Sequence, residues 1–471
     1  MRNNNFVRIA AVALLAVAIA VPSFAAARGH ADFTMFVAVG DSYGAGFEAG
    51  SLNDRHQFFS WPAVIARQVG LRLCQPGAAA ADNCFAQPLI TFPGLPAGEL
   101  VLNAAGTGLT QIPGSGAPAM ATFGRPYNNL SVPGYTVGAV LALTGAEGAA
   151  AGLGVPILRG LGSEVDQAIS LHPTFIAVWI GGNDFLGAVS QGKPSLLTST
   201  AAFTAAYNTM LDKLIAGASN AGIVVGTLPQ NFAAAPLTAR IPGILLNPAN
   251  NQPVIIGGAP VPLVSELGDG TIGPLPPGSI VLLSALTDLQ QGVGIPATFK
   301  TIPPFNALPR VGEPLKDTQT ITPAEQAQFN TRISEYNAAI AASAAAHNVA
   351  VADIKGLFDR FATSQASPLV IGPFSFTNAF PTGGLFSNDG VHLSDLGYIL
   401  FSNQYIKAIN AAYDVHIPLA SISQVFQNND PATADVLGLS MSPEVGAQMI
   451  SIFRSVTESA PATPTRRRSI H

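Results

Sequence analysis

Four short, mostly apolar runs recur along the chain and are separated by segments with helical spacing. The runs are residues 34–39 (TMFVAV), 175–180 (FIAVWI), 223–229 (IVVGTLP) and 349–354 (VAVADI). Apolar residues at successive rather than alternate positions are typical of strands buried on both faces in a parallel sheet. Because strands and helices alternate, the pattern predicts an α/β fold with a mostly parallel sheet.

The intervening segments carry recognisable helix signals. In the strongest of them, Thr322 and Glu325 form a capping-box pattern and Pro323 lies in the first turn. Residues 202–222 have amphipathic spacing, and we expect that helix to end at Gly222. Three other helices are predicted. One begins near Pro62, one covers residues 163–172 and ends at a break at Pro173, and the last covers residues 394–413.

Three segments stand outside this alternating pattern. Residues 74–130 are rich in loops, and residues 229–321 are rich in proline and glycine, with no strong helix pattern. We expect the second of these to be an insertion at the rim of the sheet that contains small strands. Residues 416–471 form an extension, with a helix near 442–459 and a disordered tail. The α/β domain itself is predicted to cover residues 33–415.

Residues 1–25 have the composition of a secretory signal peptide. Arg2 and Arg8 supply the positive start, residues 9–21 the apolar stretch, and residues 23–27 (SFAAA) the small side chains near a cleavage site. The apolar stretch is short for a bilayer-spanning helix, so a membrane anchor is the weaker alternative. No later run reaches about 18 apolar residues. We therefore expect a secreted, periplasmic or cell-envelope protein with no transmembrane segment in the mature chain.

Composition narrows the class of protein further. Charged residues make up 10% and hydrophobic residues 48% of the 471 positions, and the net charge is −5. A chain this apolar can bury a large core, and without a basic surplus we expect no nucleic-acid partner. Cys74 and Cys84 are the only cysteines in the sequence. Outside the cytoplasm, two cysteines ten positions apart are expected to form one disulfide.

Polar stretches lie where an open α/β sheet binds its ligands, beyond the carboxyl ends of the predicted strands. They are GDS at residues 40–42, SVPGYT at 131–136, GGND at 181–184 and DGVH at 389–392. A serine nucleophile needs a base to accept its proton and a third group to orient that base. Ser42, His392 and Asp389 supply these three side-chain types.

Acyl transfer also needs hydrogen-bond donors directed at the developing oxyanion. The main-chain amides of Ser42 and Gly134 and the side-chain amide of Asn183 are candidates. Each has an ordinary alternative, because a serine after a strand is usually a turn residue and an asparagine there can cap a helix. Trp179 and Tyr135, next to these blocks, either line the substrate cleft or belong to the core.

The four blocks resemble, in the same order, those of the GDSL, or SGNH, hydrolase family. The resemblance covers roughly residues 33–413, apart from the insertion. It implies a flavodoxin-like three-layer α/β/α sandwich. It also implies that Ser42 is the nucleophile, His392 the base, Asp389 the orienting acid, and Ser42, Gly134 and Asn183 the oxyanion hole. Tyr43 stands where the family name has leucine, at a position that varies among members.

Two other motifs fit less well. Residues 40–44 match G-x-S-x-G, the nucleophile elbow of α/β-hydrolases, but that elbow normally follows several strands and its acid lies well before its histidine. Gly44, Gly46 and Gly50 resemble a dinucleotide-binding fingerprint, with the last spacing one residue too long. Asp41 could act as a second acid, but we expect it to hydrogen-bond its own turn.

The sequence therefore predicts a secreted serine hydrolase that cleaves carboxylic esters, of the lipase or esterase type, with no metal and no organic cofactor. Its substrate would be a small-molecule or lipid ester. Carbohydrate O-deacetylation and thioester cleavage at the same site stay open, as does a non-catalytic binding protein on a hydrolase scaffold. Neither the acyl-chain length nor the oligomeric state follows from the sequence.

Overall fold

The computed structural model describes residues 27–103, 108–147, 151–230, 235–236, 241–248, 250–371 and 374–427. The predicted signal peptide lies outside the described residues. So do the predicted helix near 442–459 and the predicted tail. Within the described ranges, no helix is both long enough and apolar enough to cross a membrane.

A parallel sheet of four strands lies at the centre of the fold. Its strands run in the order β1 (Phe36–Gly40), β4 (Phe175–Trp179), β5 (Gly222–Gly226) and β13 (Ala350–Ala352). Every residue of β1, β4 and β5 is buried, as continuous apolar runs predict. The register pairs Gly40 with Trp179. The GDS block after β1 and the GGND block after β4 therefore lie side by side at the carboxyl edge of the sheet. The predicted α/β class with a parallel sheet is confirmed.

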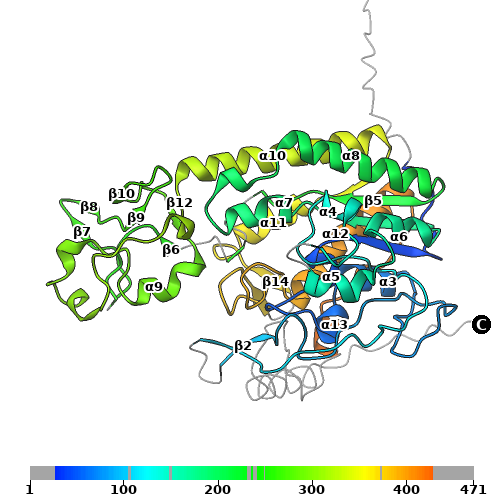
Figure 1. Cartoon of the computed structure of the whole chain (residues 1–471), viewed down its shortest axis with the longest axis horizontal. Helices are drawn as coiled ribbons and strands as arrows, with labels where there is room; N and C mark the ends of the chain where they lie inside the picture. The colour runs from blue at the N-terminus through cyan, green and yellow to red at the C-terminus, as the bar shows by residue number, and fades with distance from the viewer. Residues whose placement is uncertain are drawn as a thin grey trace, which may run out of the picture.

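Helices pack against this sheet and against one another. α12 (Asp395–Tyr413) contacts β5, β13 and α3 (Trp61–Gln68), and α6 (Glu164–Ser170) contacts β1. α8 (Thr200–Gly217) and α10 (Pro323–Ala346) lie side by side along the top of the view in Figure 1. The other described α-helices outside the predicted insertion are α1 (Ser42–Ala45), α2 (Asp54–Gln57), α4 (Ala139–Ala142), α5 (Ala151–Leu158), α7 (Asn183–Val189), α11 (Ile354–Ala362) and α13 (Ser423–Gln427).

The predicted helix starts are accurate, but one predicted end is wrong. α10 begins with the expected capping box, in which the Glu325 amide donates to Thr322 Oγ1 at 3.4 Å and the Thr322 amide donates to Glu325 Oε2 at 2.7 Å. α8 ends at Gly217, five residues before the predicted Gly222. Gly222 instead begins β5, where an added Cβ would lie 2.4 Å from the His30 carbonyl oxygen. The glycine is required by this close approach of two backbones, not by a helix end.

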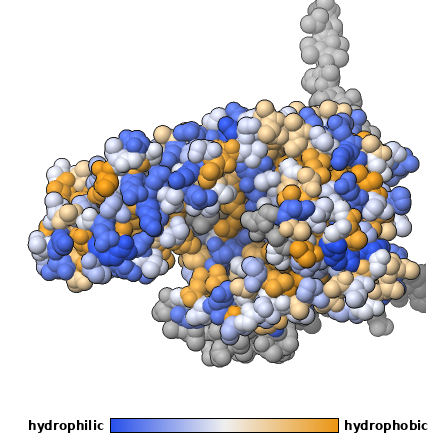
Figure 2. Space-filling view, viewed as in Figure 1, coloured by the Kyte–Doolittle hydropathy of each residue, from blue (hydrophilic) through white to orange (hydrophobic). Residues whose placement is uncertain are grey.

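The predicted insertion contains the small strands that were expected. Two hairpins pair β7 (Ile255–Ile256) with β8 (Ala259–Pro260) and β9 (Val264–Glu266) with β10 (Ile272–Pro274). A third small sheet joins β6 (Ile241–Pro242), β11 (Ile280–Val281) and β12 (Thr320–Ile321), and α9 covers Leu286–Gln290. The lobe has its own apolar cluster, which includes Leu263, Phe299 and Leu315. It projects from the body, and its surface mixes hydrophilic and hydrophobic residues (Figures 1 and 2). The exact limits of the insertion remain a prediction.

Two further hairpins and a disulfide complete the described structure. β2 (Leu100–Leu102) pairs with β3 (Leu109–Gln111), and β14 (Leu369–Ile371) pairs with β15 (Phe374–Phe376). The Cys74–Cys84 disulfide is present as predicted, with the two Cα atoms 5.1 Å apart. It belongs to a small buried cluster in the loop-rich segment rather than to the main core.

Candidate active site

Ser42 lies where the first strand turns into a short helix. β1 ends at Gly40, and Asp41 caps α1 by accepting a hydrogen bond from the Tyr43 amide at 3.0 Å through Oδ1. This is the local role predicted for Asp41. A Cβ added at Gly44 would lie 2.2 Å from Ser131 Oγ, so the second glycine of GDSYG permits close contact with the neighbouring loop. A buried strand, a cap and a tight contact therefore hold Ser42 at the carboxyl edge.

Three of the predicted site residues meet in one hydrogen-bonded chain. His392 Nε2 lies 2.8 Å from Ser42 Oγ, and His392 Nδ1 lies 2.8 Å from Asp389 Oδ2. Ser42 is 6% exposed, and the His392 side chain is 12% exposed. The fold thus brings together the first and the last polar blocks, which are 350 positions apart in the sequence.

The Asp389 carboxylate is surrounded by hydrogen-bond donors. Oδ1 accepts from the amides of Val391 at 2.9 Å and His392 at 2.8 Å, and Oδ2 also accepts from the Gly50 amide at 3.0 Å. Burial alone would raise the pKa of this carboxyl, but the His392 charge and the hydrogen bonds from His392 and Val391 hold its pKa well below the usual range. Asp389 is therefore ionised throughout the neutral range.

The charge on Asp389 decides which nitrogen of His392 carries the hydrogen. An ionised carboxylate only accepts hydrogen bonds, so Nδ1 must donate to it. The Nε2 lone pair of a neutral imidazole then faces Ser42 and can accept the hydroxyl proton. The aromatic rings of Tyr43 and Phe47 flank the imidazole, with centroids 5.5 Å and 4.9 Å from its own.

Tyr43 also fixes the segment that carries His392. Its hydroxyl donates to the Val391 carbonyl oxygen at 2.7 Å. A leucine at this position would have no such donor, so the tyrosine links the serine block directly to the histidine block. The sequence showed only that Tyr43 stands where the family name has leucine. It gave no signal that the tyrosine hydroxyl contacts the histidine block.

The other two predicted residues form a second cluster at the same edge of the sheet. Asn183, the first residue of α7, donates from Nδ2 to the Tyr135 carbonyl oxygen at 2.9 Å. This bond uses one of the two amide hydrogens and leaves the other for a ligand. Gly134 has a φ of +86°, a left-handed conformation that favours glycine. Its loop is tied to β1 by a 3.2 Å hydrogen bond from the Val132 amide to the Gly40 carbonyl oxygen.

Two buried acids that the sequence analysis missed support this loop. Glu164 accepts from the Gly40 amide at 3.0 Å and from the Val132 amide at 3.3 Å, and its residue is fully buried. Asp184 accepts from the Val137 amide at 3.0 Å. Burial raises the pKa of both carboxyls. Acids in the first turn of a helix are normally exposed, so nothing in the local pattern distinguished them.

The two aromatic residues left open by the sequence belong to the core. Trp179 is 2% exposed and Tyr135 is 1% exposed. Trp179 donates from Nε1 to the Thr227 carbonyl oxygen at 3.1 Å, and its ring lies 4.7 Å from that of Tyr43. Tyr135 reaches the site only through its main-chain carbonyl, which holds the Asn183 side chain.

Residues 282–405 match the model of the family described as GDSL-like Lipase/Acylhydrolase, a span that includes Asp389 and His392. No curated protein sequence gives a significant match. Among solved structures, the extracellular lipase of Streptomyces rimosus has 15% identity and a TM-score of 0.30, covering 80% of this chain and 98% of the other.

Two further solved structures are similar at the same level. Phospholipase A1 of Streptomyces albidoflavus has 14% identity and a TM-score of 0.30, covering 82% of this chain and 100% of the other. A protein described as a GDSL-like lipase of Parabacteroides merdae has 12% identity and a TM-score of 0.33, covering 80% and 96%. The family matched over residues 282–405 is the one that the four ordered blocks resemble, as the sequence predicted.

Proposed function

We propose that this protein is a secreted serine hydrolase that cleaves carboxylic esters through an acyl-serine intermediate. The observation that carries the proposal is the unbroken hydrogen-bonded chain from Ser42 through His392 to Asp389. Each link is 2.8 Å, and the chain lies at the carboxyl edge of the sheet, where ligands bind in open α/β folds.

Acylation begins when Ser42 Oγ attacks the ester carbonyl carbon. The hydroxyl proton passes to His392 Nε2, and the imidazolium that forms is stabilised by the Asp389 carboxylate. The four donors around that carboxylate keep it ionised and fixed, so little reorganisation accompanies the proton transfer.

The negative charge on the former carbonyl oxygen needs donors in place before the reaction. We assign this role to the amides of Ser42 and Gly134 and to the second Nδ2 hydrogen of Asn183. The bond from Asn183 to the Tyr135 carbonyl supports the assignment, because it orients the amide group beside Gly134. Collapse of the tetrahedral intermediate then expels the alcohol, which takes the proton from His392.

Deacylation repeats the same steps with water. His392 accepts a proton from the water molecule, the resulting hydroxide attacks the acyl-serine, and Ser42 leaves with the proton. None of these steps requires a metal or an organic cofactor. The proposal includes export of the mature protein by way of the predicted signal peptide, and a flavodoxin-like three-layer sandwich as its scaffold.

The acyl group of the natural ester is the open part of this proposal. The hydrophobic insertion favours a lipid-like ester, but its best-buried apolar residues pack in a cluster of their own. Three isoleucines on its hairpins remain more than half exposed, namely Ile255, Ile256 and Ile272. A strict preference for acetyl esters would favour carbohydrate O-deacetylation, and turnover of acyl thioesters would favour a thioesterase.

Hydrolysis of p-nitrophenyl esters from acetyl to palmitoyl tests the proposal. The Ser42→Ala variant should lose at least about a thousandfold of the wild-type turnover, since the nucleophile is removed. Ser367→Ala, at an exposed position, is the matched control and should keep full activity. Equal turnover by wild type and Ser42→Ala would contradict the proposal. Folded wild-type protein without turnover of any ester or thioester would favour the binding-protein alternative.

A further inference from the structure

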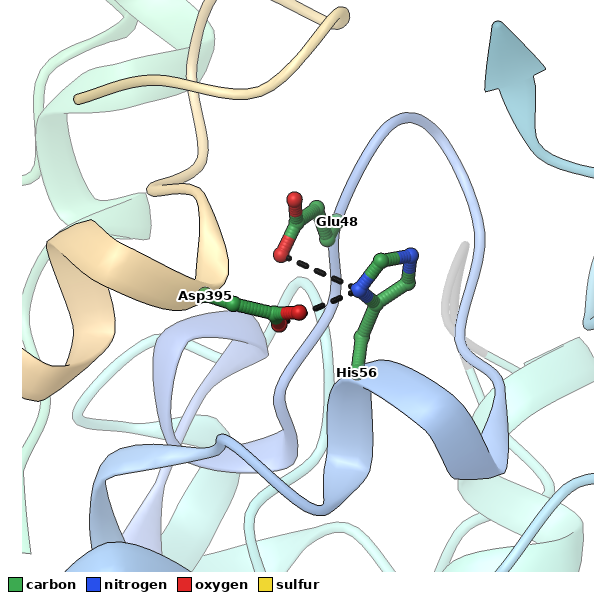
Figure 3. A group of neighbouring side chains, drawn as sticks. All are labelled: Glu48, His56 and Asp395. Atoms are coloured by element: carbon green, nitrogen blue, oxygen red, sulfur yellow. Dashed lines mark hydrogen bonds and ion pairs between the residues drawn. The ribbon is translucent and has the colours of Figure 1, made fainter. Parts of the chain in front are cut away.

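A second group of ionisable side chains lies buried beside the proposed active site. His56 is in α2 (Asp54–Gln57), Glu48 follows α1, and Asp395 is the first residue of α12. Figure 3 shows the two carboxylates directed at the same edge of the imidazole. Glu48 and His56 are fully buried, and Asp395 is 2% exposed. The proposed hydrolytic mechanism uses none of the three.

The spacing of these side chains fits a coordination shell. His56 Nδ1 lies 3.1 Å from Asp395 Oδ1 and 3.3 Å from Glu48 Oε2, and one ligand atom from each residue falls within 4.8 Å of the others. Two ligand atoms bonded to one zinc ion at about 2.0–2.1 Å lie about 3.3 Å apart in tetrahedral geometry. The two distances from Nδ1 are therefore close to the spacing of two ligand atoms on one ion, and the two carboxylate oxygens lie within 4.8 Å of each other.

Hydrogen counting on the imidazole points the same way. Nδ1 carries at most one hydrogen, yet two carboxylate oxygens from different elements lie within 3.3 Å of it. A metal ion bound to Nδ1 can contact both oxygens at once, whereas one hydrogen can be directed well at only one of them. Imidazole nitrogen and carboxylate oxygen are both zinc ligands.

Further charged side chains lie around these three residues. A third acid, Glu99, places Oε2 3.1 Å from the opposite ring nitrogen, Nε2. Arg67 also interacts electrostatically with Asp395, but its guanidinium donates to the Phe58 carbonyl and to Gln424. Buried charges are stable only when they are paired or coordinate a metal.

Glu99 has the position of an outer carboxylate in a metal site. Ligating histidines commonly direct their second nitrogen at a carboxylate, which fixes the ring orientation. Asn53 donates from Nδ2 to Glu99 Oε2 at 3.2 Å, and its Oδ1 accepts from the Arg55 amide at 3.2 Å. The same asparagine therefore holds both the outer acid and the helix that presents His56.

We propose that Glu48, His56 and Asp395 bind one divalent transition-metal ion, with Zn²⁺ the best match to these ligands. We assign the ion a structural role, because its three ligands are fully or almost fully buried. It revises the sequence-based expectation of a chain without metal. This inference does not depend on the proposed function, since metal content can be measured on inactive protein.

The proposed ion would tie the serine segment to the histidine segment. Two residues of the loop after Glu48 contact the catalytic block: the Gly50 amide donates to Asp389 Oδ2 at 3.0 Å, and the Ala49 amide donates to Ser387 Oγ at 3.0 Å. Asp395 follows His392 by three residues and begins α12. An ion bridging Glu48 and Asp395 therefore joins the two pieces of chain whose alignment sets the proposed triad.

Metal analysis of the full secreted chain tests this site. The wild-type protein, unfolded in denaturant with EDTA and refolded with Zn²⁺, should retain one zinc per chain after gel filtration and melt at a higher temperature than protein refolded without metal. Refolding with Co²⁺ should give visible absorption bands. Glu48→Gln, which keeps the shape of the side chain, should weaken Zn²⁺ binding by about tenfold or more, and His56→Gln should abolish it.

His347→Gln is the matched control, because His347 pairs with Asp212 at 3.2 Å on the surface. This control should retain the full zinc content. Wild-type protein that holds no zinc after refolding, with no change in melting temperature, would overturn the proposal. The carboxylates would then pair with a protonated His56 and not with a metal ion. Zinc content unchanged in both Glu48→Gln and His56→Gln would also overturn it, since the metal would then be bound elsewhere.

Discussion

Replacing Asp389 with asparagine tests the orienting role of this residue, because every contact of its carboxylate is with a donor. Oδ1 accepts two main-chain amides, and Oδ2 accepts the Gly50 amide and His392 Nδ1. An asparagine must place its NH₂ group at one of these two positions. In either orientation two N–H donors face the new NH₂ group, which cannot accept their hydrogen bonds.

With the NH₂ group at the Oδ2 position, the variant loses one hydrogen bond, from Gly50. His392 can then accept from the NH₂ group only by moving its own hydrogen to Nε2. That tautomer presents an N–H to Ser42 and cannot act as a base. The chain can still fold, but the predominant form of Asp389→Asn is inactive.

With the NH₂ group at the Oδ1 position, the catalytic tautomer survives, but two main-chain amides lose their acceptor. One more unsatisfied buried donor than in the other orientation costs about 1–3 kcal/mol. Loss of the carboxylate charge weakens the bond to the imidazolium by about 1–2 kcal/mol more. The sum, about 2–5 kcal/mol, corresponds to a fall in kcat/KM of about 30-fold to 5,000-fold.

The assay is hydrolysis of a short p-nitrophenyl ester by the purified variants, with the unfolding midpoint measured in parallel. Asp359→Asn is the matched control, since Asp359 pairs with Lys355 at 2.6 Å on a partly exposed helix face. That control should keep full turnover. A folded Asp389→Asn variant with turnover within threefold of wild type would refute the orienting role, as would an equal loss in Asp359→Asn.

Three further predictions concern separate parts of the structure. Asn183→Ala should lower kcat by about 100–1,000-fold with little change in KM, because an oxyanion donor acts mainly in the transition state; a loss seen only in KM would contradict this. The pKa of Asp41 is raised to about 8, mainly by burial. The folded state therefore keeps a proton on Asp41 that the unfolded state loses between about pH 4 and 8. Asp41 alone should contribute a slope in the free energy of unfolding of about −1.4 kcal/mol per pH unit in that range. Asp41→Asn should remove that slope in urea unfolding, and equal slopes would show that Asp41 is ionised. Replacing Cys74 and Cys84 with serine should lower the free energy of unfolding by about 3 kcal/mol and spare turnover; an unchanged unfolding midpoint would contradict this.

Most of the sheet could be predicted because its strands are buried on both faces. A short continuous apolar run such as that of β4 is typical of a strand buried on both faces of a parallel sheet. The predicted end of α8 is wrong because glycine is also the residue type that ends helices. Only the neighbouring His30 backbone explains the glycine at position 222. That contact joins segments nearly two hundred residues apart.

The candidate triad could be predicted because each block has an unusual local pattern. The residues around it could not. His56 lies in the polar segment NDRHQ, which resembles an exposed turn, and Glu164 lies in a first helical turn, where acids are usually solvated. Both are buried only because distant segments cover them, so their local sequence carries no signal of their partners.

The most direct test of the central claim is the site of labelling by a fluorophosphonate probe, located by mass spectrometry of the folded protein. We predict a single phosphonylated residue, Ser42, with labelling lost in Ser42→Ala and strongly slowed in His392→Gln, where no base accepts the hydroxyl proton. A folded wild-type protein that remains unlabelled, or that is labelled at another serine, would contradict the account.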